Sequence, residues 1–380
     1  MIVIIGCGAA GISALNTLSR LGIKDVLVIS SERPYSKPLL PYYLGGEVSR
    51  NEVFLSNKKI LQDKVIQVNP RENTILLEKN KEVIEYDQLL IATGAYPVKP
   101  KIDGIDKRGV FTLNTLKDAD EIIRYLKNVR KAVVIGAGFV GISAAVALKK
   151  RNIDVSIVEL RDRVLADALD KDFAEIAREI LERNGIEIFL GKSVSKILGD
   201  NAVKGVLVGD VEIGCDIVVT SVGVRPNIEF LKNSGINIRT GIVVNERMQT
   251  NFKNVYAAGD CAETKDFITG EYTINAVWIN ASIQGRVAAS NIADIKSTYD
   301  GSIRMNVIDI FGVPFISIGY TTNDFERLDN RKIFYKGEKI VGFQAIGFEN
   351  IKGALRTILG RGKGIQELYI YTSRLLIPNF

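Results

Sequence analysis

Histidine is absent from all 380 residues of this chain. The absence excludes mechanisms that use histidine as a general base, as the partner of a nucleophile or as a metal ligand. Cysteine is scarce too, because Cys7, Cys215 and Cys261 lie far apart in the sequence. They form no C-x-x-C redox pair, and so few cysteines in a long chain do not make a disulfide framework. We therefore expect no metal site and no chemistry based on a cysteine pair.

Long apolar runs and a strong charge bias are also missing. No stretch approaches the roughly 18 apolar residues of a membrane span, and Met1 leads directly into a short apolar strand, not a signal peptide. We expect a cytoplasmic protein that contacts no membrane. The 50 basic and 44 acidic residues leave a net charge of +6, which fits sites for anionic dinucleotides or a docking face for an acidic protein. No zinc-finger or RNA-binding motif points to nucleic acid.

Two glycine fingerprints are present, each between an apolar strand and an expected helix. Gly6-Cys7-Gly8-Ala9-Ala10-Gly11 follows Ile2–Ile5, and Gly136-Ala137-Gly138-Phe139-Val140-Gly141 follows Ala132–Ile135. In such G-x-G-x-x-G turns the first glycine makes the turn, the second lets backbone approach a pyrophosphate, and the third lets helix and strand pack. The helix N-terminus adds free N–H groups. Two such motifs predict two dinucleotide sites.

An acidic residue about 20 positions after a fingerprint normally binds the adenosine ribose. Glu159 takes this place for the second fingerprint, which favours NADH because a carboxylate repels a 2′-phosphate. Arg161 and Arg163 keep NADPH open as the alternative. For the first fingerprint the matching strand ends in serines, so the displaced Glu32 is the candidate.

The order of the elements predicts a duplicated plan. We expect one nucleotide-binding unit in residues 1–107 and 239–299, a second one inserted at 108–238, and a small α+β unit at 300–380. The length alone predicts two or three domains. Residues 34–43, rich in proline and tyrosine, are expected to form a loop, and helices are expected at Lys117–Asn128 and Asn350–Leu359.

Four further segments carry a family resemblance. They are Asn254–Glu263 with its Gly259-Asp260 turn, Ala92-Thr93-Gly94, Val222–Asn227 and Trp278–Gly285. Together with the fingerprints they resemble the FAD/NAD(P)H-dependent pyridine nucleotide-disulfide oxidoreductase superfamily over residues 1–300. The resemblance implies an α/β fold with two Rossmann-like dinucleotide-binding domains, one inserted in the other, plus a small α+β C-terminal domain. It also implies that Asp260 contacts the ribitol of FAD.

The resemblance supplies two sets of expected cofactor residues. For FAD they are Gly6, Gly8, Ala9, Ala10, Gly11, Glu32, Lys37, Pro38, Ala92, Thr93, Gly94, Gly259, Asp260 and Trp278. For NADH they are Gly136, Gly138, Phe139, Val140, Gly141, Glu159 and Gly223. Lys37, Tyr42 and Trp278 are the candidate neighbours of the flavin.

The segment Tyr35–Leu44 is most similar to the rubredoxin reductase, nitrite-reductase-associated and NADH oxidase branch. Relatives that reduce coenzyme A disulfide or peroxide carry a reactive cysteine where this chain has Pro38. Many relatives also pair a glutamate with a lysine near the flavin, where this chain has Ser143 and Tyr42. Proline cannot be a nucleophile, so we expect no thiol chemistry and no catalytic side chain. The absence of the glutamate and the lysine leaves the surroundings of the flavin N5 atom open.

The resemblance therefore implies an enzyme in which the cofactors carry the chemistry. Hydride would pass from NADH to FAD, and electrons would pass on to a small redox protein such as rubredoxin or ferredoxin. Two alternatives stay open: an NADH oxidase that uses dioxygen, and an NADH-binding flavoprotein that acts as a sensor or as the reductase subunit of a larger complex. Dimerisation through residues 300–380 is also left open.

Overall fold

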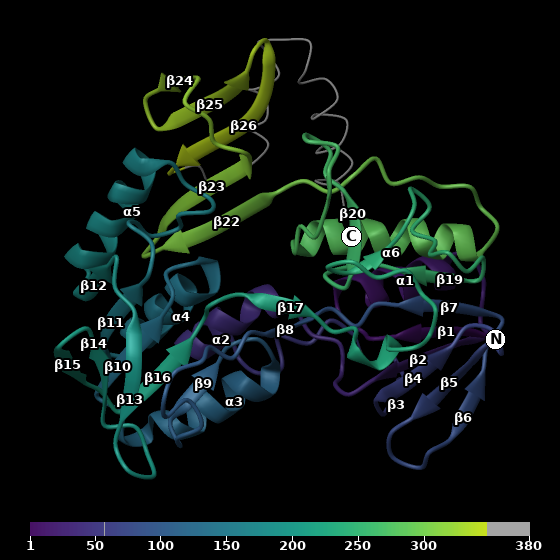
Figure 1. Ribbon diagram of the computed structural model, residues 1–380, viewed down its shortest axis with the longest axis horizontal. Helices are drawn as coiled ribbons and strands as arrows, with labels where there is room; N and C mark the ends of the chain where they lie inside the picture. Colours follow the sequence, from purple (N-terminus) through teal and green to yellow (C-terminus); the bar gives the residue numbers. More distant parts are fainter. Residues whose placement is uncertain (57, 348–380) are drawn as a thin grey trace.

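The computed structural model describes residues 1–56 and 58–347. Its first layer is a parallel sheet of order β19-β7-β1-β2-β3 (Figure 1). The strands are β1 (Ile2–Ile5), β2 (Val26–Ser30), β3 (Leu61–Gln62), β7 (Gln88–Ile91) and β19 (Val255–Ala257). Since β19 pairs with β7, the chain returns to its first sheet after a long excursion. That excursion contains the second nucleotide-binding unit.

Two helices cover one face of the first sheet. They are α1 (Ala9–Arg20) and α6 (Trp278–Ile292), which lie side by side in Figure 1. Gly285 permits this close approach, because a Cβ atom there would lie 2.1 Å from the carbonyl oxygen of Ala10. The strands beneath are continuous apolar runs, as expected for a parallel sheet that is buried on both faces. The turn before α1 and the turn after β19 therefore lie next to each other at one end of the sheet.

The second unit repeats this plan with a parallel sheet of order β12-β11-β10-β16-β9. Its strands are β9 (Val110–Thr112), β10 (Lys131–Ile135), β11 (Asp154–Glu159), β12 (Ile186–Leu190) and β16 (Ile217–Thr220). Its helices are α3 (Leu116–Tyr125), α4 (Phe139–Lys150) and α5 (Lys171–Arg183). The prediction of Lys117–Asn128 is slightly long, because α3 ends at Tyr125 and residues Leu126–Asn128 form a 3-10 turn, η2. A capping box between Thr115 and Asp118 fixes the start of α3.

Short antiparallel sheets complete the two nucleotide-binding units. One contains β4 (Val65–Asn69), β5 (Thr74–Leu77) and β6 (Val83–Glu85), and the other contains β13 (Val194–Leu198), β14 (Gly205–Val208) and β15 (Val211–Gly214). A two-stranded ribbon of β8 (Ala95–Pro97) and β17 (Val224–Pro226) joins the units. The remaining small sheet contains β18 (Ile242–Val243), β20 (Ala262–Lys265) and β21 (Tyr272–Thr273). A short 3-10 turn, η3 (Glu229–Leu231), follows β17.

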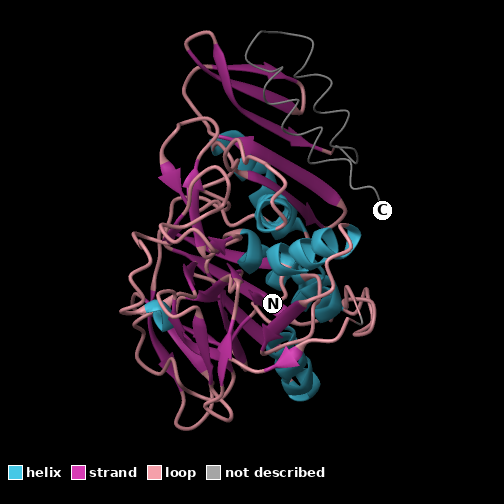
Figure 2. Cartoon of the chain, turned by 90° about the vertical axis from the view of Figure 1, so that its right-hand side faces the viewer, coloured by secondary structure: helices cyan, strands magenta, loops and turns pink. Residues whose placement is uncertain are grey.

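The third unit is an antiparallel sheet of order β22-β23-β26-β25-β24. Its strands are β22 (Met305–Ile310), β23 (Val313–Gly319), β24 (Phe325–Leu328), β25 (Arg331–Lys336) and β26 (Lys339–Ile346). Figure 2 shows this sheet at the top of the molecule, above the helices. The sequence did not indicate β24, and the helix expected at Asn350–Leu359 lies outside the described residues. A buried lysine ties the sheet to α5, because Lys332 donates to the carboxylate of Asp172 at 2.6 Å and also pairs with Asp170.

The loop predicted for residues 34–43 is correct only as far as Ser36. The chain forms a 3-10 turn, η1 (Lys37–Leu39), and then the short helix α2 (Leu40–Gly45). Proline misled the prediction, although Pro38 and Pro41 both occupy the first turn of their helices, where a missing N–H leaves no bond unmade. The helix ends at Gly46, whose φ of +83° forms a left-handed cap. Within the described part of the chain, no helix is both long and apolar enough to cross a membrane.

Candidate active site

A cavity of about 420 Å³ lies where the two nucleotide-binding units and the third unit meet. The first unit contributes the turn before α1, the segment from η1 to α2, and the turn after β19. The second unit contributes one face of α4, and the third unit contributes β22. The main lining residues are Gly8, Ala9, Ala10, Lys37, Pro38, Tyr42, Ala92, Gly94, Asn114, Phe139, Val140, Ser143, Gly259, Asp260 and Trp278.

The two fingerprints fold in the same way. A Cβ atom on Gly6 would lie 2.2 Å from the carbonyl oxygen of Ala92, and one on Gly136 would lie 2.2 Å from that of Ser221. Both glycines also have a positive φ, of +98° and +104°. A Cβ atom on the third glycine, Gly11 or Gly141, would lie 2.0 Å from the carbonyl oxygen of the first. The outer glycines of each turn are therefore required for folding.

The middle glycines differ, because a Cβ atom on Gly8 or Gly138 would meet nothing within 4 Å. Each is the N-cap of its helix, and neither α1 nor α4 has a side-chain cap or an acidic residue in its first turn. The N–H groups at both helix starts thus face open space beside a positive dipole end. This arrangement fits the pyrophosphate of a dinucleotide at each turn.

Asp260 borders the cavity at the turn after β19. The turn needs Gly259, whose φ is +84°, and the side chain of Gln284 on α6 accepts the N–H of Gly259 at 2.7 Å. Burial raises the pKa of Asp260, and the positive charge of Lys37 opposes the shift. Lys37 also borders the cavity and donates to the side-chain oxygen of Asn114 at 3.2 Å. A carboxylate and an ammonium group therefore lie in one wall.

Glu159 stands at the end of β11 and binds its own fingerprint. Its carboxylate accepts the backbone N–H groups of Ala137 at 2.6 Å and of Arg161 at 2.7 Å. The guanidinium groups of both arginines are already paired, Arg161 with Asp167 at 3.2 Å and Arg163 with Asp162 at 2.8 Å. The acid predicted for the ribose thus lies beside the second turn.

Glu32 lies outside the main cavity. It lines a second hollow of about 320 Å³ together with Arg33, Arg50 and Phe54, and its carboxylate accepts the hydroxyl of Tyr35 at 2.8 Å. The guanidinium of Arg33 stacks over the ring of Phe54 at 4.6 Å. The hollow therefore combines an aromatic face, a carboxylate and cations.

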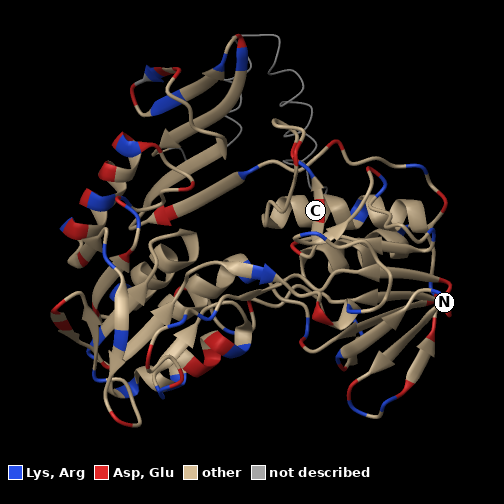
Figure 3. Cartoon of the chain, viewed as in Figure 1, with Lys and Arg blue, Asp and Glu red and all other residues tan. Residues whose placement is uncertain are grey.

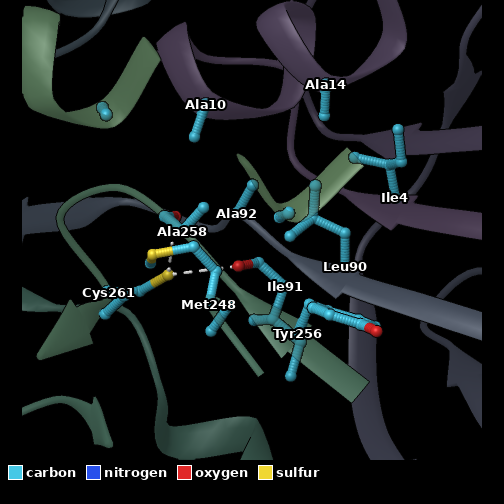
Figure 4. Close-up of a cluster of buried hydrophobic side chains, with 14 of the residues drawn as sticks. Ile4, Ala10, Ala14, Leu90, Ile91, Ala92, Met248, Tyr256, Ala258 and Cys261 are labelled. Carbon is cyan, nitrogen blue, oxygen red and sulfur yellow. Dashed lines mark hydrogen bonds between the residues drawn. The ribbon is translucent and has the colours of Figure 1, made fainter. Parts of the chain in front are cut away.

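No cysteine lines the main cavity in the described part of the chain. Cys7, Cys215 and Cys261 are all buried, and burial raises the pKa of each thiol, that of Cys215 to about 12. Figure 4 shows Cys261 inside an apolar cluster with Met248 and Ala258. All three thiols therefore stay protonated near neutral pH, which suits packing and not redox chemistry.

Most of the expected flavin-side residues border the main cavity, but several expected residues do not. Those that lie elsewhere are Gly6, Gly11, Glu32, Thr93, Gly136, Gly138, Gly141, Glu159 and Gly223. Thr93 instead donates to the carbonyl oxygen of Asn227 at 2.7 Å and fastens the joining ribbon. The outer fingerprint glycines lie inside their turns.

Sequence reasoning also missed lining residues of two kinds. Asn114, Glu47 and Lys150 carry polar groups, and Val307, Ile308 and Asp309 come from β22. For Lys150, the helical spacing from Phe139 through Ser143, Val146 and Ala147 was an available signal. For β22 there was none, because only the fold brings it to the site.

Comparison with known proteins also indicates a protein that binds dinucleotides. The family model described as pyridine nucleotide-disulphide oxidoreductase matches residues 1–285. The chain belongs to this family. Its cofactors are FAD and NAD(P)H, and it is an FAD-dependent NAD(P)H oxidoreductase.

Three proteins illustrate the similarity. The chain is 33% identical to an NADH oxidase of Methanocaldococcus jannaschii, covering 92% of this chain and 88% of that protein. It is similar to an NAD-dependent persulfide reductase from A. fulgidus, with a TM-score of 0.88, 28% identity and coverage of 96% and 76%. It is also similar to a ferredoxin reductase from Rhodopseudomonas palustris, with a TM-score of 0.85, 25% identity and coverage of 91% of each chain. The chain spans about half the length of two Bacillus subtilis relatives, 48% of a nitrite reductase and 44% of an electron transfer subunit of assimilatory nitrate reductase.

Proposed function

We propose that this protein oxidises NADH and passes the electrons through FAD to a small redox protein of the rubredoxin or ferredoxin type. The observation that carries the proposal is one cavity bordered by Gly8, Asp260 and Trp278 on one side and by Phe139 and Val140 on the other. Residues of both fingerprints thus border the same space. When bound there, FAD can take a hydride from the nicotinamide and release electrons to an acceptor.

For FAD, the turn at Gly8 would bind the pyrophosphate and Asp260 would bind the ribitol hydroxyls. Gln284 supports this role, because its bond to the N–H of Gly259 orients the turn from behind. Lys37 and Trp278 would lie at the flavin ring. The hollow at Glu32 would take the adenosine end, with the carboxylate on the ribose and the stack of Phe54 and Arg33 beside the adenine.

For the pyridine nucleotide, the turn at Gly138 would bind the pyrophosphate and Glu159 the adenosine ribose. The carboxylate of Glu159 would lie close to a 2′-phosphate and repel it. Arg161 and Arg163 would give little compensation, because aspartates already neutralise them. These contacts favour NADH over NADPH.

The acceptor would receive electrons from the flavin directly. Pro38 borders the cavity where thiol-using relatives carry a cysteine, and the buried cysteines lie elsewhere. Similarity to a ferredoxin reductase and a net charge of +6 support an acidic redox protein as the acceptor. Similarity to an NADH oxidase supports dioxygen as the second candidate.

Anaerobic titration with NADH and then NADPH, followed by flavin absorbance, tests this function. We expect NADH to bleach the flavin near one equivalent and NADPH to do so only at much higher concentration. Reoxidation by added rubredoxin or ferredoxin should then be much faster than reoxidation by air. Fast recovery in air alone would favour the oxidase, and a flavin that neither nucleotide bleaches would refute the proposal.

A further inference from the structure

The carboxylate of Asp266 is buried and accepts four hydrogen bonds. Asp266 is 2% exposed and begins the turn between β20 and β21, whereas Figure 3 shows charged residues mainly at the periphery of the molecule. One carboxylate oxygen accepts the backbone N–H groups of Ile268 and Thr269, both at 2.9 Å. The other accepts the side-chain amide of Asn275 and the hydroxyl of Tyr320, both at 2.8 Å. Among the described residues no ion pair includes this carboxylate, so these four donors offset the cost of burying it.

The donors to Asp266 join two units of the fold. Asn275 follows β21 in the first unit, and Tyr320 follows β23 in the third. The third unit holds Tyr320 firmly, because its N–H donates to the carbonyl oxygen of Val341 in β26 at 2.8 Å and the guanidinium of Arg304 lies 4.6 Å from the centre of its ring. Burial, and then the hydrogen bond to Asp266, raise the pKa of Tyr320, so its hydroxyl stays a donor at neutral pH.

Asn275 extends this network to the start of α6. Its side-chain amide also donates to the hydroxyl of Ser302 at 2.8 Å. Its carbonyl oxygen accepts the N–H of Val277 at 2.8 Å and the side-chain amide of Asn280 at 3.2 Å. Asn280 is 0% exposed and donates to the carbonyl oxygen of Ile303 at 2.8 Å. The backbone is therefore fixed on both sides of the first residue of α6.

That first residue is Trp278, which borders the main cavity together with Ala276. Its ring is partly buried against the core of the first unit. Its indole N–H makes no hydrogen bond to any residue that the structure describes. The place of the ring therefore depends on the backbone on either side of it.

We propose that Asp266 is a positioning residue that holds Trp278 at the flavin ring, and that Tyr320 is the contact through which the third unit takes part. The inference rests on the proposed function, which places the flavin beside Trp278. Without the acceptor oxygens of Asp266, residues 275–280 lose their anchor and the indole leaves the cavity wall. The third unit thus acts on the flavin site through a carboxylate that does not itself border the cavity.

Fluorescence of the FAD-loaded protein tests this role, because Trp278 is the one tryptophan of the chain. The measured quantity is the rate constant for quenching by acrylamide, obtained from fluorescence lifetimes. Asp266→Asn keeps the shape of the side chain but replaces one acceptor oxygen by a donor, and Tyr320→Phe removes only the contact with the third unit. Because one hydrogen bond to a charged group shifts an equilibrium about tenfold, the quenching constant should rise about twofold or more in Asp266→Asn and by a smaller factor in Tyr320→Phe.

A double-mutant cycle shows whether Asp266 acts through Trp278. Asp266→Asn should raise the dissociation constant for FAD about tenfold, and the same change in a Trp278→Phe background should raise it much less. The second effect is smaller because the ring that Asp266 positions has already been replaced. An equal effect in both backgrounds would mean that Asp266 supports the fold alone, and would overturn the inference.

Tyr272→Phe is the matched control. Tyr272 lies on β21 in the same hairpin, and its hydroxyl makes no hydrogen bond among the described residues. Phenylalanine also keeps the ring over which Arg239 stacks at 4.6 Å. Its quenching constant should equal that of the unmodified protein. Unchanged quenching in both Asp266→Asn and Tyr320→Phe would overturn this inference alone, whereas a Trp278→Phe variant with unchanged affinity for FAD would overturn the proposed place of the flavin.

Discussion

Replacing Gly138 by leucine should separate nucleotide binding from folding. The backbone at Gly138 has a φ of −79°, which leucine adopts without strain, and its Cβ would meet nothing within 4 Å. The folded chain therefore accepts the side chain. The leucine would occupy the space in front of the first N–H groups of α4, where we place the pyrophosphate. We expect the dissociation constant for NADH to rise at least a hundredfold, which corresponds to about 2.7 kcal/mol.

Gly141→Ala, three residues further on, is the contrasting variant. Its Cβ would lie 2.0 Å from the carbonyl oxygen of Gly136, so the helix or the turn must move. Overpacking of this kind costs about 1–3 kcal/mol or more, and it should lower the midpoint of thermal unfolding. Gly138→Leu should leave that midpoint unchanged in the absence of nucleotide.

Three measurements distinguish the two variants. The ratio of flavin to protein absorbance reports FAD content, which Gly138→Leu should not change. Anaerobic titration reports NADH binding, and thermal unfolding reports stability. The reasoning is refuted if Gly138→Leu still lets NADH bleach the flavin at one equivalent. It is equally refuted if that variant loses as much stability as Gly141→Ala.

Three further predictions follow from the site and its surroundings. Glu159→Gln keeps an acceptor for the N–H of Ala137 but removes the negative charge. The ratio of kcat/KM for NADH to kcat/KM for NADPH should therefore fall at least tenfold. An unchanged ratio would show that Glu159 does not contact the ribose. Asp260→Asn should weaken FAD binding at least tenfold. The same change should raise the unfolding midpoint of the FAD-free protein at pH 7, because burial raises the pKa of Asp260 and its ionised form therefore destabilises the fold. That gain should shrink as the pH falls and vanish below the ordinary aspartate pKa of about 3.9, where the carboxyl is protonated in both states. A gain independent of pH would contradict the assignment. Lys332→Met should lower the free energy of unfolding by about 2–4 kcal/mol in denaturant titrations, because Lys332 is 0% exposed and its loss leaves Asp170 without its cation. The control is Lys336→Met at an exposed position, which should have no measurable effect.

Local sequence patterns predicted most of the fold. The two fingerprints placed β1, α1, β10 and α4 within a residue or two, because strand, glycine turn and helix each leave a local signal. The ribbon of β8 and β17 was missed, since strands of three residues carry no periodicity. The helix α2 was missed because proline was taken as a loop former when it occupies a first helical turn.

The cavity itself was only half predictable. Every residue expected near the flavin was found through a motif or through the family resemblance, both of which depend on local runs of sequence. Ile308 and Asp309 carry no such constraint, although they border the same cavity as Lys37. Their place depends on the packing of the third unit against α4, which is a contact between distant segments. Local patterns hold no information about such contacts.

The two fingerprints also differ in a way that their shared pattern hides. In the second, the carboxylate of Glu159 accepts the N–H of Ala137 directly, so the acid that we propose for the ribose also holds the turn. In the first, the equivalent residue Cys7 donates its thiol to the carbonyl oxygen of Glu32 at 3.0 Å, and the Glu32 carboxylate bonds Tyr35 instead. Glu32 lies two residues beyond the end of β2 and borders a separate hollow, which Arg33 and Phe54 also line. The spacing rule proposes an acid for each ribose, but it does not predict whether the carboxylate also accepts an N–H of the turn, because that depends on how the chain folds after the strand.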